Sequence, residues 1–152
     1  MVPRVPIRTI LVPTDFSEGA ASAFGWARTL AHAFHAEITL LHVIDLAYTW
    51  TSISGPAAVP TPVPSDVVDR ITEVARESLA ALSKDAKETT HRLIRKGHAR
   101  EVILDVAKEL KADLIVLGTH GHRGLSELFM GSVAEYVVRH APVPVMTTRA
   151  PE

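Results

Sequence analysis

Near the end of the chain lies the run Leu114-Ile115-Val116-Leu117-Gly118-Thr119-His120-Gly121-His122-Arg123-Gly124, and Gly131-Ser132 follows after residues 125–130. The run begins with four apolar residues of the kind that form a buried strand. Residues 132–140 are expected to form a short helix. A strand, a glycine-containing loop and a helix N-terminus together bind phosphate groups through backbone N–H donors and the positive end of the helix dipole. The pattern therefore predicts a nucleotide-binding loop.

Composition narrows the class of protein further. The 152 residues are 47% hydrophobic and 22% charged, which is ordinary for a single soluble domain over residues 1–152. The net charge of −1 gives no long-range attraction to nucleic acid or to an anionic membrane. The absence of cysteine excludes disulfides, thiolate catalysis and cysteine-ligated zinc. With no apolar signal segment and no run of about 18 apolar residues, the sequence predicts a cytoplasmic protein.

Strand and helix patterns alternate along the chain. Helices are expected after the capping residues Ser17 and Ser65, and again across residues 100–110 and 132–140. The proline-rich residues 45–64 are expected to form an irregular loop. The alternation predicts a doubly wound α/β fold, in which helices cover both faces of a parallel sheet. Strands are expected at residues 7–13, 37–44, 91–95, 114–117 and 142–148, of which the polar third strand belongs near a sheet edge.

A ligand in such a fold binds beyond the carboxyl ends of the strands, where the strand order reverses. The first expected strand ends at Pro13-Thr14-Asp15 and the fourth ends at Gly118. If these two strands are neighbours, Asp15 and the glycine loop line one crevice. An Asp at this position also commonly shapes a turn or caps the next helix, so Asp15 has two possible roles.

The glycine positions suit contact with an anion. Gly118 would let the backbone approach a ligand without a side chain in the way, and Gly121 can adopt positive φ and reverse the chain. Gly131-Ser132 would open a helix whose first N–H groups, from Ser132 and Val133, are free to bind phosphate. The alternative is that both loop glycines only build a turn and that Ser132 only caps its helix.

The spacing Gly118-x-x-Gly121, nine residues, Gly131-Ser132 resembles the nucleotide-binding signature of the universal stress protein family. The resemblance extends over nearly the whole chain and is weakest across residues 45–64. Further matching segments are Ile10-Leu11-Val12-Pro13-Thr14-Asp15-Phe16-Ser17, Leu40-Leu41-His42-Val43 and the stretch from Gly131 to Val145.

This resemblance implies a Rossmann-like fold of the adenine-nucleotide alpha hydrolase kind, a five-stranded parallel sheet of order 3-2-1-4-5. Because every signature position is present, the chain resembles the branch of the family that binds ATP. Asp15 would then hold the ribose with Pro13 and Thr14 beside it, and the backbone of Val43 would meet the adenine. The ribose and phosphates would be surrounded by Gly118, Gly121, Gly131, Ser132 and Val133, with one or two of His120, His122 and Arg123 facing the phosphates.

The resemblance further implies a homodimeric nucleotide sensor or regulator of the stress response rather than an enzyme. The P-loop pattern Gly-x-x-x-x-Gly-Lys-Ser/Thr is absent, and the glycine loop contains no lysine. Mg²⁺ is expected to arrive on the ATP phosphates, because Mg²⁺ usually binds substrate oxygens and water. No protein-ligated metal is expected. Two alternatives stay open: an interaction module that works without nucleotide, and a slow ATPase or autokinase with Ser132 as the phosphate acceptor.

The segment Val143 to Thr148 bears on assembly. It is apolar and β-branched, and at a sheet edge its unpaired N–H and C=O groups would invite a partner strand. In the family that the chain resembles, this edge pairs with its copy in a second subunit, which implies a two-fold homodimer. A further protein partner is expected but not identified by the sequence, and neither nucleic acid nor membrane is expected to bind.

Overall fold

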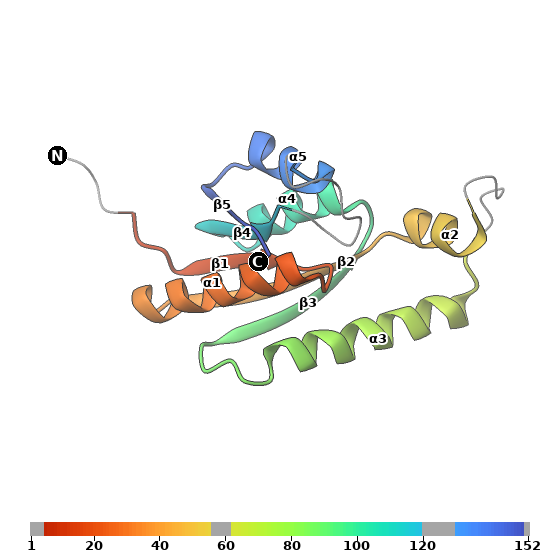
Figure 1. The fold of residues 1–152 in the computed structure, drawn as a ribbon, viewed down its shortest axis with the longest axis horizontal. Coiled ribbons are helices and arrows are strands. Elements are labelled where there is room, and N and C mark those ends of the chain that lie inside the picture. The colour runs from red at the N-terminus through yellow and green to blue at the C-terminus, as the bar shows by residue number, and fades with distance from the viewer. Residues whose placement is uncertain (1–4, 56–61, 120–129, 151–152) are drawn as a thin grey trace.

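The computed structural model describes residues 5–55, 62–119 and 130–150. Five parallel strands form one sheet in the order β3-β2-β1-β4-β5, which confirms the expected order 3-2-1-4-5 (Figure 1). The elements in chain order are β1 (Thr9–Pro13), α1 (Glu18–Phe34), β2 (Glu37–Ile44), α2 (Leu46–Ser54), α3 (Ser65–Ser83), β3 (Thr90–Lys96), α4 (Ala99–Glu109), β4 (Leu114–Gly118), α5 (Ser132–His140) and β5 (Val145–Thr148).

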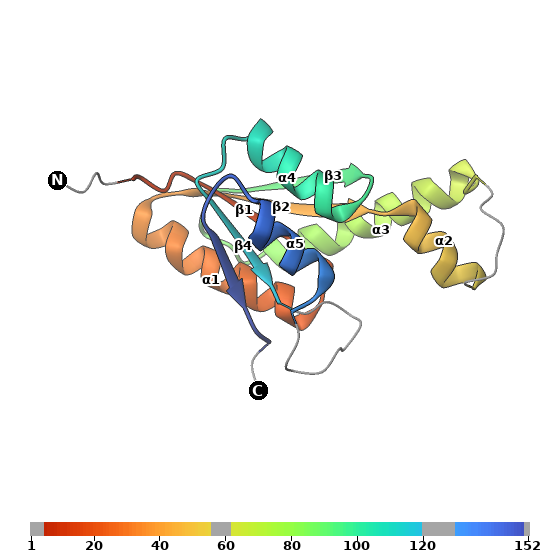
Figure 2. The ribbon, with the colours of Figure 1, turned by 90° about the horizontal axis from the view of Figure 1, so that it is seen from above.

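Helices cover both faces of the sheet, and alternate residues of each strand divide between two cores (Figure 2). Ile10 and Val12 of β1 pack with α1 and α3 on one face. Leu11 between them packs with α4 and α5 on the other face. All three side chains are 0% exposed, which makes β1 the centre of the molecule.

Helix α1 lies close to the middle of the sheet because its inner side is built from small residues. Ser17 caps its start, as expected, by accepting a hydrogen bond from Ala20 N at 3.2 Å. The buried positions along the helix are Gly19, Ala20, Ala23, Phe24, Ala27 and Ala31.

Two expectations for residues 45–65 are wrong. Residues 46–54, expected as irregular loop, form α2, because these residues contain neither proline nor glycine and the first breakers are Gly55 and Pro56. Ser65 is the first residue of α3 rather than its cap. The cap is Pro64, whose carbonyl oxygen accepts from Val67 N and Val68 N at 3.1 Å each.

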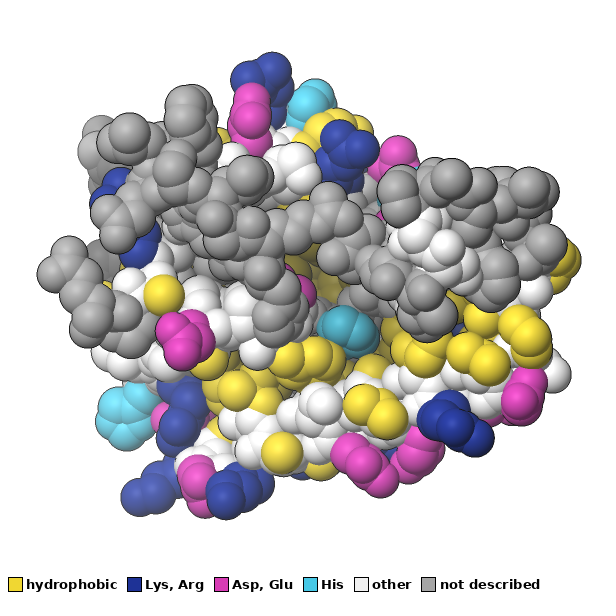
Figure 3. Space-filling model, turned by 45° about the vertical axis from the view of Figure 1, so that its right-hand side comes forward, with side chains coloured by type: hydrophobic (Ala, Val, Ile, Leu, Met, Phe, Trp, Pro, Cys, Tyr) yellow, Lys and Arg dark blue, Asp and Glu magenta, His cyan; other side chains and the backbone are white. Residues whose placement is uncertain are grey.

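Helix α3 is half-exposed along part of its apolar side. Val74 is 57% exposed, and Val67, Val68 and Ile71 are half-buried. Apolar side chains gather in a band across this face of the molecule (Figure 3). None of the helices in the described ranges is long and apolar enough to cross a membrane.

The two edge strands differ from their expected lengths. The polar third strand lies at the sheet edge, as expected, and runs from Thr90 to Lys96. The last strand was expected from residue 142 but begins at Val145. Pro142 and Pro144 have no N–H to donate to a ladder, although the Pro144 carbonyl still accepts from Ile115 N at 3.0 Å.

Candidate functional site

Strands β1 and β4 are neighbours, as the crevice hypothesis required. Ile10 pairs with Leu114, and Leu11 pairs with Ile115. The strand order reverses between these two strands, so the segments that follow Pro13 and Gly118 leave the carboxyl end of the sheet side by side. The carboxyl end of the sheet, beside β1 and β4, is therefore the candidate functional site.

The turn after β1 is held by hydrogen bonds from its own side chains. Thr14 Oγ1 accepts from Phe16 N at 3.0 Å, and Asp15 Oδ1 accepts from Ser17 N at 3.0 Å. Thr14 N donates to Leu41 O at 2.8 Å, which ties the turn to β2. Asp15 therefore shapes the turn, which is one of the two roles expected for it. Its side chain is exposed at the carboxyl end of the sheet.

His42 supports the same turn, a role that sequence reasoning missed. Its Nδ1 lies 2.8 Å from Thr14 O, and because a carbonyl only accepts, Nδ1 carries the proton. Its ring packs on Phe16 with centroids 4.6 Å apart, and Phe16 has a φ of 65°, which is unusual for a residue with a side chain. Burial lowers the pKa of His42, partly offset by the bond to Thr14 and the charge of Asp15. The signal was a polar residue inside the apolar strand Ile38–Ile44.

Packing against α1 requires a glycine at position 118. A Cβ there would lie 2.7 Å from Gly19 C and 2.9 Å from Gly19 O. The place that a side chain of residue 118 would occupy is thus filled by the backbone of α1. This close approach brings the N-terminus of α1 against the end of β4.

The glycine loop is closed at its base. Thr119 N donates to Thr148 O at 2.8 Å, and Gly131 N donates to Thr119 O at 2.6 Å. Thr119 and Gly131 therefore meet, and β5 braces them. His120, Gly121, His122 and Arg123 lie outside the described residues.

Helix α5 begins at this closed base without a side-chain cap. Its N-cap is Gly131, with φ −61° and ψ 151°, and no side-chain cap hydrogen bond is present in this part of the described chain. Ser132 is the first helical residue, so the alternative that it only caps the helix is wrong. The first N–H groups of α5, from Ser132 and Val133, are positioned at the positive end of the helix dipole.

The other expected site residues that the structure describes also lie at the carboxyl end of the sheet. Pro13 ends β1, and Val43 is the penultimate residue of β2, where it is half-buried against the α4 and α5 core. Within the described ranges, no group of three or more His, Cys, Asp or Glu side chains could hold a metal ion.

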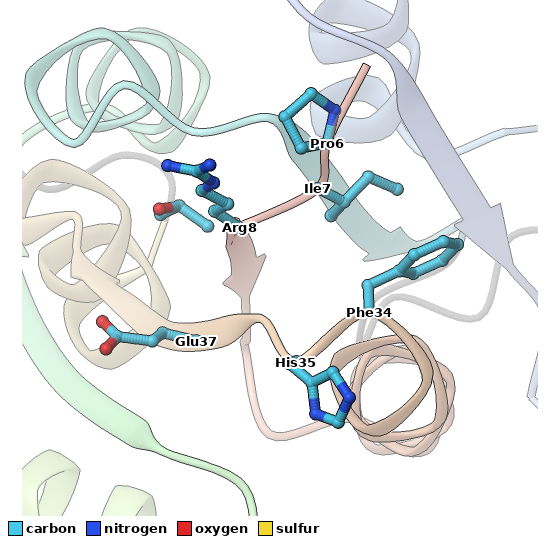
Figure 4. Close-up of a pocket in the computed structure, with 7 residues that line it drawn as sticks. Pro6, Ile7, Arg8, Phe34, His35 and Glu37 are labelled. Atoms are coloured by element: carbon cyan, nitrogen blue, oxygen red, sulfur yellow. The ribbon is translucent and has the colours of Figure 1, made fainter. Parts of the chain in front are cut away.

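A cavity lies at the opposite end of the sheet, near the start of β1 and the end of α1. It has a volume of about 530 Å³ and is lined by Pro6, Ile7, Arg8, Thr9, Phe34, His35 and Glu37. Ile7 and Phe34 border one side of this hollow, and Arg8 and Glu37 lie on the other (Figure 4). Helix α1 ends here, and the negative end of a helix dipole disfavours a phosphate.

Parallel α/β architecture with a glycine loop at the switch point defines a Rossmann-like class of protein. Within that class, the chain belongs to the universal stress protein family, whose model matches residues 6–149. It is 32% identical to universal stress protein MJ0531 of Methanocaldococcus jannaschii over 148 residues, which are 95% of this chain and 84% of that protein.

Solved structures agree with the family assignment. The structure of MJ0577 of Methanocaldococcus jannaschii superposes with a TM-score of 0.81 at 28% identity, covering 97% of this chain and 99% of that one. A universal stress protein solved with cAMP shares the fold at 20% identity and a TM-score of 0.66, covering 97% of this chain and 100% of that one. An Arabidopsis thaliana member solved with AMP also shares the fold, at 21% identity and a TM-score of 0.58. The match covers 95% of this chain and 92% of that one.

Proposed function

We propose that this protein is an ATP-binding regulator, with the nucleotide at the carboxyl ends of β1 and β4 and its phosphates at the N-terminus of α5. The observation that carries the proposal is the α5 N-terminus, which no described side chain caps and which the Gly131 to Thr119 hydrogen bond fixes beside β4. Such a helix start binds anions through its N–H groups and its dipole.

The residues around this helix start suit the parts of a nucleotide. Ser132 and Val133 would donate their N–H groups to the phosphates, and the exposed Ser132 hydroxyl would add a donor. Asp15 would face the ribose, with Pro13 and Thr14 beside it. The backbone of Val43 would meet the adenine, while Gly118 and Gly131 frame the loop whose His120, Gly121 and His122 would close over the phosphates.

Relatives support an adenine nucleotide as the ligand class. Two members of the family were solved with cAMP and with AMP. ATP is the finer proposal, because the spacing of Gly118, Gly121 and Gly131 matches the family's ATP-binding signature in full. Mg²⁺ would be carried by the phosphates rather than by a protein site.

We propose a sensor role rather than turnover. Residues 118–132 contain no lysine, the residue that P-loop enzymes direct at the β- and γ-phosphates. Nucleotide binding would instead hold residues 119–130 against the phosphates and so change the surface that a partner protein meets.

The outer edge of β5 supports a homodimer. Pro144 O accepts from Ile115 N of β4, and Thr148 O accepts from Thr119 N just after it. Because alternate residues of β5 bond in this direction, the N–H and C=O groups of Val145 and Thr147 point outward. Trp26 is 52% exposed on α1, two turns beyond Gly19, whose carbonyl accepts from Thr148 Oγ1. A second copy pairing along β5 would cover both the outward backbone groups and this tryptophan.

Two substitutions test the dimer. Val145→Lys places a charge in the paired edge, and Thr147→Pro removes an outward N–H without removing a bond to β4. Both variants should be monomeric by light scattering. Dimers in both would refute pairing along β5.

The nucleotide proposal is tested by identifying what copurifies with the protein. The protein is denatured, and the supernatant is analysed by anion-exchange chromatography with mass detection. ATP near one per chain is expected from the native protein and from the control Gly25→Ala, whose added Cβ meets nothing within 4 Å. Gly131→Val, with a φ that any residue adopts, should stay folded and lose the ATP.

The opposite result would favour an alternative. An empty protein that also fails to bind added Mg·ATP in calorimetry would sink the sensor proposal and leave a nucleotide-independent interaction module. Phosphate release or self-labelling that disappears in Ser132→Ala would instead indicate a slow ATPase or autokinase.

A further inference from the structure

The second edge of the sheet, formed by β3, has a regular set of outward backbone groups. Ile38 N donates to Thr89 O at 2.8 Å, and Gly97 N donates to Ile44 O at 3.1 Å. In a parallel ladder, the backbone of every second residue forms hydrogen bonds to the adjacent strand. The backbone N–H and C=O groups of the odd-numbered residues of β3 therefore point toward β2. The N–H and C=O groups of Arg92, Ile94 and Lys96 therefore point away from the sheet.

The side chains of these three residues share one face of the strand. Ile94 packs on the core beneath α3, and Arg92 donates from Nε to Ser83 Oγ at 2.9 Å. Figure 1 shows α3 lying alongside β3. The outward edge thus presents two cations with a half-buried apolar residue midway between them.

In the described part of the chain, Arg92 and Lys96 have no counterions. Residues 90–100 contain four Arg or Lys residues and no Asp or Glu. Arg95 pairs with Glu109 at 3.1 Å and His98 with Asp45 at 3.0 Å, whereas Arg92 and Lys96 have no acidic partner among the described residues. An incoming carboxylate would therefore find uncompensated positive charge at both positions.

The charges also decide against a second copy of this chain as the occupant. Antiparallel self-pairing centred on Ile94 would place Arg92 opposite Lys96 of the other copy, and like charges directly opposite destabilise a strand pair. Arg95 Nη1 donates to the outward Ile94 carbonyl at 3.5 Å, a long contact that an incoming N–H can replace.

We propose that the outer edge of β3 docks an extended acidic segment of a partner protein by strand addition. The backbone of Arg92, Ile94 and Lys96 supplies the hydrogen bonds, as in other sheets that bind peptides at an edge. The alternation of the strand sets the recognised pattern: two carboxylates four residues apart, with an apolar residue midway. This surface is separate from the proposed nucleotide site.

The test uses the whole isotope-labelled protein and the peptide Thr-Glu-Thr-Val-Thr-Glu-Thr, followed by NMR. The amides of Arg92, Ile94 and Lys96 should shift on titration and exchange more slowly with solvent, while those of Leu93 and Arg95 change less. A peptide with Lys in place of Glu should not bind. Shifts confined to other elements, or equal binding of both peptides, would overturn the proposal.

Charge reversal gives a second readout. Arg92→Glu with Lys96→Glu should bind the acidic peptide about tenfold more weakly at low salt and should gain affinity for the lysine peptide. Lys84→Glu with Lys108→Glu changes the net charge equally at exposed sites on other elements and should leave affinity for both peptides nearly unchanged. If the two double variants lose the same affinity for the acidic peptide, the attraction comes from the net charge of the protein rather than from Arg92 and Lys96 on β3. The single variant Lys96→Glu gives the same comparison should the double variant not fold.

Discussion

The two ends of the sheet present opposite backbone charge. At the carboxyl end the helices begin, and the N-terminus of α5 carries no side-chain cap in the described structure. At the amino end α1 finishes, and Phe34 and His35 at its C-terminus line the cavity of about 530 Å³. The hollow at the amino end is therefore a poor place for a phosphate. Backbone donors, rather than cavity volume, are therefore the reason to propose the carboxyl end as the phosphate site.

The two ends also hold the central strand differently. At the carboxyl end, β1 is fixed by the ring of His42 on Thr14 O and by the contact of Gly118 with Gly19. At the amino end, the carboxylate of Asp113 holds the start of β1, because its Oδ2 accepts from Arg8 N at 2.8 Å and from Thr9 N at 3.0 Å. Changes at the carboxyl end should affect both stability and nucleotide, and changes at the amino end should affect stability alone.

The largest expected effect follows from Gly118→Val. The added Cβ would lie 2.7 Å from the backbone of Gly19, which cannot move without shifting α1. We expect a loss of at least about 3 kcal/mol in the free energy of unfolding, measured by urea denaturation. Gly25→Ala is the control and should stabilise α1 by about 0.5–1 kcal/mol. Equal stability of the two variants would disprove the close contact.

Asp113→Ala should have a smaller effect, at the other end. It leaves the N–H groups of Arg8 and Thr9 without their acceptor, which should cost about 1–3 kcal/mol in the free energy of unfolding. Calorimetry with Mg·ATP should give the same affinity as the native protein, because the proposed phosphate site lies at the carboxyl end of the sheet. A parallel loss of affinity would show that the two ends are not independent.

His42 should make the carboxyl end sensitive to pH. Its pKa in the folded protein is lowered mainly by burial, so below about pH 6.5 the unfolded chain takes up a proton before the folded one does. The free energy of unfolding should therefore fall as pH drops from about 6.5 towards the folded pKa, and it should change little from this residue above that range. Denaturant titrations across pH measure this slope.

The control for that prediction is His42→Gln, which removes the titrating ring but leaves the other seven histidines in place. The pH slope below about 6.5 should be shallower in this variant than in the native protein. Identical slopes would mean that His42 is not the residue responsible.

The smallest effect is expected from Phe34→Ser in the amino-end cavity. Phe34 is 51% exposed, so stability should change by about 1 kcal/mol or less. Mg·ATP affinity should stay within experimental error of the native value in calorimetry. Weaker nucleotide binding would place the ligand in the amino-end cavity and reverse the comparison between the two ends.

Much of the fold was predictable because it depends on local patterns. Alternating apolar strands and amphipathic segments indicated a parallel α/β sheet, and the polar residues of β3 indicated an edge. The strand order came with the resemblance to a family rather than from periodicity. Helix α2 was missed because its neighbours are rich in proline, although its own residues are not.

The sequence alone determined the class of fold and the signature Gly118, Gly121, Gly131 and Ser132. Only the tertiary structure decided that Gly118 makes room for α1, that His42 holds the turn at Thr14, and that Arg92, Ile94 and Lys96 turn their backbone outward. The physical reason is the distance along the sequence between the residues that interact. Helix periodicity and glycine spacing are fixed by neighbours along the chain, whereas close approach, ring contacts and ladder register depend on segments that meet only after folding.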